Sequence, residues 1–105
     1  MLSIKEMIWH LYLLRCSDDT VYTGIARDVD ARLRAHAAGR GARYTRGRGP
    51  LRLIAQARCQ SHSEALRLEY SIKQLSRTHK LRLAKPRRLA AFVLRYRTMK
   101  RESTD

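Results

Sequence analysis

Glu69 places a carboxylate on a helical stripe that is otherwise apolar, formed by Ala65, Leu68, Ile72 and Leu75. Burying an unpaired charge costs several kcal/mol, so this position needs an explanation. Three remain open: a buried partner such as Arg32 in a metal-free protein, a role as metal ligand, or a stripe that opens onto a cleft.

Arg32 and His36 are four residues apart on a predicted helix, so their side chains project from neighbouring turns. They lie beside the apolar stripe of that helix, formed by Val29, Leu33 and Ala37. Each residue alone is more often a surface or structural group. Together they could contact one phosphate.

Two tyrosines, Tyr12 and Tyr22, fall in predicted strands, where a tyrosine usually packs with its hydroxyl satisfied by a neighbour. Gly24 lies two residues from Tyr22 and therefore on the same face of its strand. Glycine inside a strand often marks the close approach of a ligand or of another backbone. Such an approach would lie beside Tyr22.

The segment from Gly39 to Pro50 holds four of the five glycines and predicts a flexible basic loop. It either contacts phosphates, with an aromatic ring available for stacking, or is a solvated connection; we favour contact. Its basic and aromatic residues are Arg40, Arg43, Tyr44, Arg46 and Arg48.

The chain has 23 Lys and Arg residues against 9 Asp and Glu, a formal net charge of +14. Arginine binds phosphate bidentately, so this excess predicts a polyanionic partner, with nucleic acid favoured over an anionic membrane surface. Cys16 and Cys59 lack metal-site spacing and are expected to be buried thiols rather than a disulfide. No apolar stretch approaches the roughly 18 residues of a membrane span. We expect a cytoplasmic protein.

Three segments are expected to position these groups first. Residues 8–16 are almost continuously apolar and aromatic, which predicts a central strand covered on both faces. A turn at 17–19 leads to an antiparallel strand at 21–25. A helix from about 29 to 38 follows, with Asp28 as its N-cap.

The second half continues with a strand at 51–59, whose apolar residues occupy alternate positions and predict one face toward the core. Ser61 and Glu64 form a capping box that opens the helix carrying Glu69. A short helix is expected from about 76 to 84. The order β-β-α-β-α-α predicts an α+β fold with a small three-stranded antiparallel sheet flanked by helices.

A basic amphipathic helix is predicted after Pro86, with apolar residues at Leu89, Phe92, Val93 and Tyr96. We expect it to dock on the domain, ahead of binding phosphates or forming a dimer contact. Residues 1–85 are therefore taken as one domain and 86–105 as an extension of it.

The ordered set of these residues resembles the GIY-YIG nuclease superfamily. His10-Leu11-Tyr12 and Tyr22-Thr23-Gly24 correspond to its two signature triplets. Arg32 follows the second tyrosine by ten residues, with His36 one turn later, and Glu69-x-x-Ile72-Lys73 has the form of the acidic helix.

The resemblance covers roughly residues 8 to 84 and is strongest to small, free-standing bacterial members. Their Tyr-Thr-Gly-Ile, Tyr-Thr-Arg-Gly and Leu-Ser-Arg stretches appear here at 22–25, 44–47 and 75–77. The chain departs from the superfamily in its first triplet, which lacks glycine and isoleucine. It also has Ile25 where some members carry lysine. Other members place an asparagine after the acidic helix, but this chain contains no asparagine.

This resemblance implies metal-assisted hydrolysis of a phosphodiester. Glu69 would bind one divalent cation, Mg²⁺ or Mn²⁺. Tyr22 would help to activate or orient the attacking water, with Tyr12 nearby. Arg32 would stabilise the developing charge, and His36 could relay a proton or hold the phosphate.

The nucleic-acid contacts are expected from Gly24, from Lys73 and from the arginines and tyrosine of the basic loop. The expected substrate is DNA rather than RNA, branched, nicked or damaged as in repair, and the protein is expected to be a monomer or weak homodimer. Two alternatives stay open. One is a nucleic-acid-binding module on a nuclease fold that is inactive alone, and the other is a basic protein associated with RNA or ribosomes.

Overall fold

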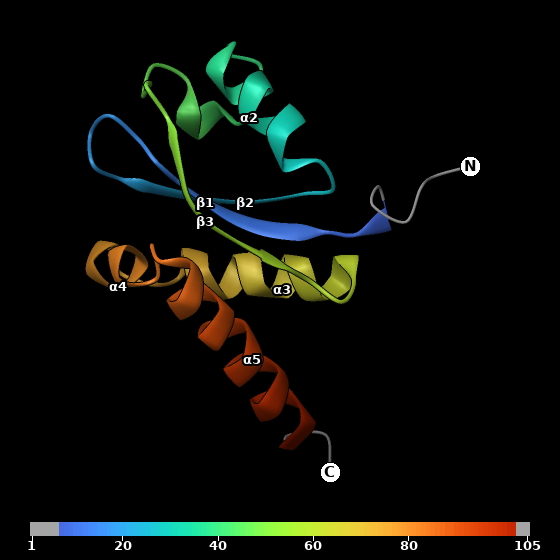
Figure 1. The fold of residues 1–105 in the computed structure, drawn as a ribbon. Coiled ribbons are helices and arrows are strands. Elements are labelled where there is room, and N and C mark those ends of the chain that lie inside the picture. The colour runs from blue at the N-terminus through green and yellow to red at the C-terminus, as the bar shows by residue number, and fades with distance from the viewer. Residues whose placement is uncertain (1–6, 103–105) are drawn as a thin grey trace.

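A three-stranded antiparallel sheet separates two helical layers in the computed structural model, which describes residues 7–102 (Figure 1). The elements are β1 (His10–Arg15), β2 (Val21–Ala26), α2 (Val29–Ala37), η1 (Arg43–Thr45), β3 (Arg52–Arg58), α3 (His62–Lys73), α4 (Arg77–Arg82) and α5 (Pro86–Glu102). The strand order is β2-β1-β3. Helix α2 covers one face, and α3, α4 and α5 lie on the other (Figure 1). The predicted α+β architecture is confirmed.

The central strand β1 is buried on both faces, as its apolar run predicts. Leu11 and Leu13 pack in the core beneath α3 and α5, whereas Tyr12 and Leu14 pack with residues of α2 on the opposite face. None of these four residues is more than 1% exposed. Because successive side chains of a strand alternate between faces, β1 joins the two cores.

Strand β3 contains a register shift opposite Leu13 and Leu14, which pair with Ala55 and Leu53 and leave Ile54 as the extra residue. An extra residue reverses which side chains face which layer. Ala55 therefore packs with the core of α3 and α5, but Leu53 packs with that of α2. The prediction that alternate residues of this strand share one core was wrong beyond the bulge.

The predicted caps of α2 and α3 are present, with one difference. Asp28 accepts a hydrogen bond from the Ala31 N–H at 3.0 Å, and Ser61 Oγ accepts one from the Glu64 N–H at 3.0 Å. The Glu64 carboxylate, however, accepts from the Gln60 N–H at 2.9 Å, one residue before the position that a capping box uses. The same carboxylate is also bound by α5.

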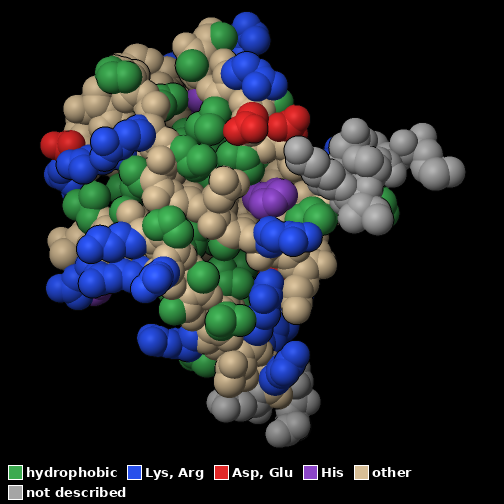
Figure 2. All heavy atoms as spheres, viewed as in Figure 1, with side chains coloured by type: hydrophobic (Ala, Val, Ile, Leu, Met, Phe, Trp, Pro, Cys, Tyr) green, Lys and Arg blue, Asp and Glu red, His purple; other side chains and the backbone are tan. Residues whose placement is uncertain are grey.

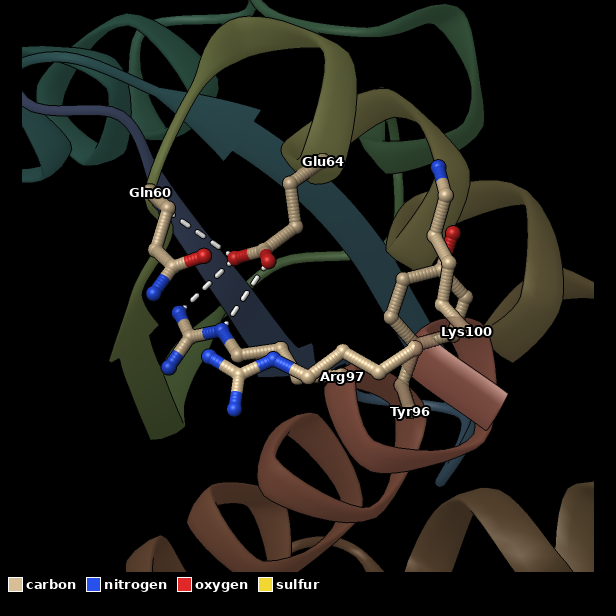
Figure 3. A pocket seen from close by; sticks show the side chains of 6 residues that line it. Gln60, Glu64, Tyr96, Arg97 and Lys100 are labelled. Atoms are coloured by element: carbon tan, nitrogen blue, oxygen red, sulfur yellow. Dashed lines mark hydrogen bonds and ion pairs between the residues drawn. The ribbon is translucent and has the colours of Figure 1, made fainter. Parts of the chain in front are cut away.

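An ion pair connects helix α5 to α3 (Figure 3). Arg97 donates to Glu64 from Nε at 2.9 Å and from Nη2 at 2.8 Å, so the contact is bidentate. Leu89 and Val93 of α5 are buried in the core that α3 also lines. The predicted docking of this helix is confirmed.

Both cysteines, Cys16 and Cys59, are buried and unpaired, as predicted. Among the described helices, none is long and apolar enough to cross a membrane. The boundary between a domain at 1–85 and an extension at 86–105 stays a prediction, and its residues 1–6 and 103–105 lie outside the described part of the chain.

Candidate functional site

The predicted site residues converge beside β2, an edge strand contacted by α2, α3 and α4. The ring centroid of Tyr22 lies 6.3 Å from that of Tyr12 and 5.3 Å from that of His36. Arg32 and Glu69 act electrostatically on both tyrosine hydroxyls. Residues from β1, β2, α2 and α3 thus meet at one place.

Gly24 makes room for Tyr12. The two residues face each other across β1 and β2. A Cβ added to Gly24 would overlap the Tyr12 hydroxyl and come within 2.5 Å of its Cζ. The group that approaches this glycine is therefore the side chain of Tyr12 rather than the expected ligand or second backbone, and a contact of Gly24 with nucleic acid stays a prediction.

His36 is 3% exposed and is hydrogen-bonded through both ring nitrogens. Its Nε2 lies 2.8 Å from the Tyr12 hydroxyl, and its Nδ1 lies 2.9 Å from Oγ1 of Thr45. Thr45 Oγ1 donates to the Ala42 carbonyl at 2.8 Å, which leaves its oxygen free to accept from Nδ1–H. In that tautomer Nε2 accepts a hydrogen bond from the Tyr12 hydroxyl. A longer contact of 3.3 Å, from the Ala42 N–H to Nδ1, would need the tautomer with the proton on Nε2.

Burial disfavours the charged form of each of these three groups. It raises the pKa of Tyr12 to about 12, and the nearby Tyr22 adds to the rise while Arg32 opposes it. Burial also raises the pKa of Tyr22, with Glu69 adding to the effect and Arg32 opposing it. The pKa of His36 is lowered by burial and then by Arg32. Both phenols and the imidazole are therefore neutral at pH 7.

Glu69 lies where its helix stripe meets solvent. The neighbouring stripe residues Ala65, Leu68 and Ile72 are fully buried, whereas the Glu69 side chain is 20% exposed. Its ion pair is with Lys73, at 3.5 Å from Oε2 to Nζ. Among the three explanations for this carboxylate, the structure favours a stripe that opens at the edge of the core.

A divalent metal fits this donor set only if it needs few protein ligands. In the described part of the chain, no three or more His, Cys, Asp or Glu residues are grouped as a metal cage. Mg²⁺ keeps several waters and commonly takes one or two carboxylates together with substrate phosphates. Glu69, partly exposed beside Arg32 and the tyrosines, is compatible with such a site.

The basic loop touches the site through Tyr44. The ring centroid of Tyr44 lies 5.8 Å from that of Tyr22. On the Tyr44 ring, the guanidinium carbon of Arg48 lies 4.3 Å from the centroid. Arg48 also pairs with Asp18 in the turn between β1 and β2. Tyr44 is nevertheless 41% exposed, and its stacking on a base stays a prediction. The remaining loop arginines, Arg40, Arg43 and Arg46, are exposed.

Three further residues belong to this region and were not singled out from the sequence. A Cβ at Gly41 would clash with the His36 ring, at 2.6 Å from Cγ. Thr45 holds the same ring through a hydrogen bond. Lys80 of α4 lines a groove beside Tyr22. Thr45 lies in the Tyr-Thr-Arg-Gly stretch and Gly41 in the glycine-rich segment, but only its charge marks Lys80.

Basic side chains extend over both helical layers on the face shown in Figure 2, where acidic side chains are confined to two small areas. With a net charge of +14, such a surface attracts polyanions over a large part of its area.

Comparison with known proteins places the chain among catalytic domains of one type. The family model described as "GIY-YIG catalytic domain" matches residues 8–82. A UPF0213 protein of Cupriavidus necator is 51% identical over 75 residues, covering 71% of this chain and 82% of the relative. A UPF0213 protein of Yersinia pestis is 44% identical over 93 residues, covering 87% and 98%. The solution NMR structure of a UPF0213 protein from Bacillus halodurans is 51% identical, covers 73% of this chain and 82% of its own, and has a TM-score of 0.48.

Proposed function

Since the chain belongs to the GIY-YIG family, and within it to the UPF0213 proteins, we propose that it is a metal-dependent nuclease that hydrolyses phosphodiester bonds in DNA. The observation that carries the proposal is the convergence of Tyr12, Tyr22, Arg32, His36 and Glu69 beside one edge strand. The expected substrates are branched, nicked or damaged DNA, in a repair-type role.

Arg32 binds the scissile phosphate in this proposal. Arg32 is half-buried, and its guanidinium acts on both tyrosine hydroxyls. A fixed positive charge at the point where negative charge develops lowers the barrier, typically by about 3–4 kcal/mol for one such donor. His36 does not hold the phosphate, because it is buried and both of its nitrogens are engaged.

Tyr22 orients the attacking water. It is half-buried, whereas Tyr12 is only 1% exposed, so of the two phenols Tyr22 is the one that water can reach. Its raised pKa makes it a neutral hydrogen-bonding group rather than a base in the protein without substrate. Tyr12 and His36 are positioning residues, since their buried hydrogen bond fixes the wall against which Tyr22 and Arg32 lie.

Glu69 is the proposed ligand of one Mg²⁺ or Mn²⁺ ion. When bound, the ion would supply positive charge that acidifies water and stabilises the phosphate in the transition state. Glu69 can present its carboxylate to that ion at the solvent-exposed end of its stripe, after its weak pair with Lys73 has separated.

The decisive experiment is DNA cleavage by wild type, Glu69→Gln and Arg32→Lys on branched, nicked, single-stranded and linear substrates, with and without Mg²⁺. We expect metal-dependent cleavage by wild type and a loss of at least about 100-fold in each variant. Asp30→Asn, an exposed carboxylate on the first turn of α2, is the control and should cleave as wild type does.

The catalytic assignment would be rejected if wild type cleaved none of these substrates. It would also be rejected if Glu69→Gln and Arg32→Lys both cleaved as well as wild type. If wild type bound DNA tightly under the same conditions without cutting it, the binding-module alternative would replace the nuclease.

A further inference from the structure

A groove of about 260 Å³ lies directly beside the candidate site and shares Tyr22 with it. Strand β2 supplies one wall, the ring of Tyr44 closes one side, and two lysines come from α3 and α4. The lining residues are Val21, Tyr22, Thr23, Tyr44, Lys73 and Lys80.

Lys80 is the unusual member of this groove. It is half-buried, and within residues 7–102 it has no carboxylate partner. The other lysine of the groove, Lys73, is more exposed and pairs with Glu69. Its positive charge on the wall of the groove is not neutralised by a neighbouring carboxylate, so it attracts an anion into the groove.

The position of the groove indicates which anion. Lys73 connects it to the candidate metal ligand Glu69, and the ammonium of Lys73 lies 5.8 Å from the ring centroid of Tyr22. Any anion bound between the two lysines is therefore a close neighbour of the group that Arg32 would bind. Along a nucleic-acid strand, that neighbour is the next backbone phosphate.

The lysines, rather than the aromatic residue, define what the groove binds. One face of Tyr44 is covered by the guanidinium of Arg48, and its ring also contacts Tyr22. Lysine acts toward phosphate as a compact point charge without the directional fork of arginine. The groove is therefore suited to a backbone phosphate in a strand of any base sequence.

We propose that Lys80, assisted by Lys73, binds the backbone phosphate adjacent to the scissile one and so sets the position of the substrate strand across β2. This assignment rests on the proposed function for the identity of the strand, but the binding it predicts does not require cleavage.

The test measures binding of a fluorescent single-stranded 12-mer by wild type, Lys80→Gln and Lys85→Gln, in chelator, over a range of salt concentrations. Lys85 is an exposed lysine between α4 and α5 that lines none of this groove, so its variant removes the same charge elsewhere. We expect Lys80→Gln to weaken binding about 3- to 10-fold and to reduce the salt slope by roughly 0.7, the value for one phosphate contact on a single strand. Lys80→Arg should restore most of the affinity, and Lys85→Gln should change it less than 2-fold.

Three results would overturn the proposal: no binding by wild type, an affinity of Lys80→Gln within 2-fold of wild type, or an equal loss in Lys85→Gln. Inorganic phosphate, titrated by NMR, identifies the source of the anion. If Lys80→Gln lost inorganic phosphate but kept the oligonucleotide, the groove would be a free-anion site and the proposal would be wrong.

Failure of this proposal is distinguishable from failure of the proposed function. A wild type that binds through Lys80 but never cleaves DNA would support the groove and reject the nuclease. A wild type that cleaves, with unchanged binding and cleavage in Lys80→Gln, would reject the groove alone.

Discussion

The hydroxyl of Tyr12 occupies the space that a side chain at Gly24 would fill, because the two residues face each other across β1 and β2. The same hydroxyl is hydrogen-bonded to His36. The geometry of the candidate site therefore depends on a residue that contributes no functional group.

Gly24→Ala should displace Tyr12 from His36 and reduce cleavage by about 100-fold, a loss that a shift of about 1 Å can cause. Overpacking at this buried position should also cost about 1–3 kcal/mol of unfolding free energy. Gly49→Ala is the matched control, because a Cβ there meets nothing within 4 Å. Cleavage assays and urea denaturation measure both effects. Equal behaviour of the two variants would contradict this account of Gly24.

The buried His36 should make stability depend on pH. Its folded pKa is lowered by burial, so its contribution is present above the unfolded value of about 6.5 and is lost as pH falls through the lower folded pKa. The urea midpoint of wild type should decrease below pH 6.5, and His36→Gln should flatten that decrease. His79→Gln, at an exposed histidine of α4, should keep the wild-type profile. An identical profile in His36→Gln would refute the assignment.

The bidentate contact between Arg97 and Glu64 should stabilise the docking of α5. Glu64→Gln should cost about 1–3 kcal/mol, as expected for hydrogen bonds to a charged group in a largely buried place. The hydrogen bond from Arg97 lowers the pKa of Glu64, so this contribution is present at neutral pH. It should be lost as pH falls below the ordinary carboxyl value of about 4.3.

Chemical denaturation of Glu64→Gln, Arg97→Gln and the double variant at pH 7 measures the coupling between the two side chains. Arg95→Gln, at an exposed position of the same helix, is the control. Additive effects of the two single variants would show that the contact contributes nothing.

Lys73 should compete with the metal ion for Glu69. Removing an ammonium 3.5 Å from the carboxylate should lower the Mg²⁺ concentration needed for half-maximal cleavage. Because Lys73 is 46% exposed, the change should be small, corresponding to about 1 kcal/mol or less. A Mg²⁺ titration of Lys73→Gln against Lys85→Gln measures it. A higher Mg²⁺ requirement in Lys73→Gln would contradict the competition.

The exposed arginines of the basic loop should contribute to binding through counterion release. Replacing Arg40, Arg43 and Arg46 with Gln should reduce the salt slope for duplex DNA by up to about 2.7, at roughly 0.9 per phosphate contact. A matched triple replacement of Arg87, Arg88 and Arg95 on α5 tests whether position matters. An unchanged slope in the loop variant would make the loop a solvated connection.

The order and approximate bounds of the elements could be predicted from the sequence, because caps, glycines and apolar periodicity are local signals. Asp28 and Ser61 cap the helices that they were predicted to cap. The bulge at Ile54 could not be predicted, because a register shift depends on how β3 pairs with β1 rather than on either strand alone.

The candidate site likewise contains residues that could be predicted from the sequence and residues that could not. Tyr12, Tyr22, Arg32, His36 and Glu69 were predicted from the resemblance of their ordered motifs to the GIY-YIG family, and the fold brings them together. The positions of Gly41 and Thr45 against His36 depend on the path of an irregular loop. No local pattern in a chain with 23 basic residues distinguishes Lys80 from the others.

The location of the candidate site at an outer strand has a consequence for the kind of polymer that it can accept. Tyr22 belongs to β2, which within residues 7–102 has a strand neighbour on one side only, and α2 and α3 lie on opposite faces of the sheet. Under the proposed function, a strand can be laid across this open margin from the side. No free end has to be threaded, and a bond far inside a long or closed-circular molecule is as accessible as one near its terminus.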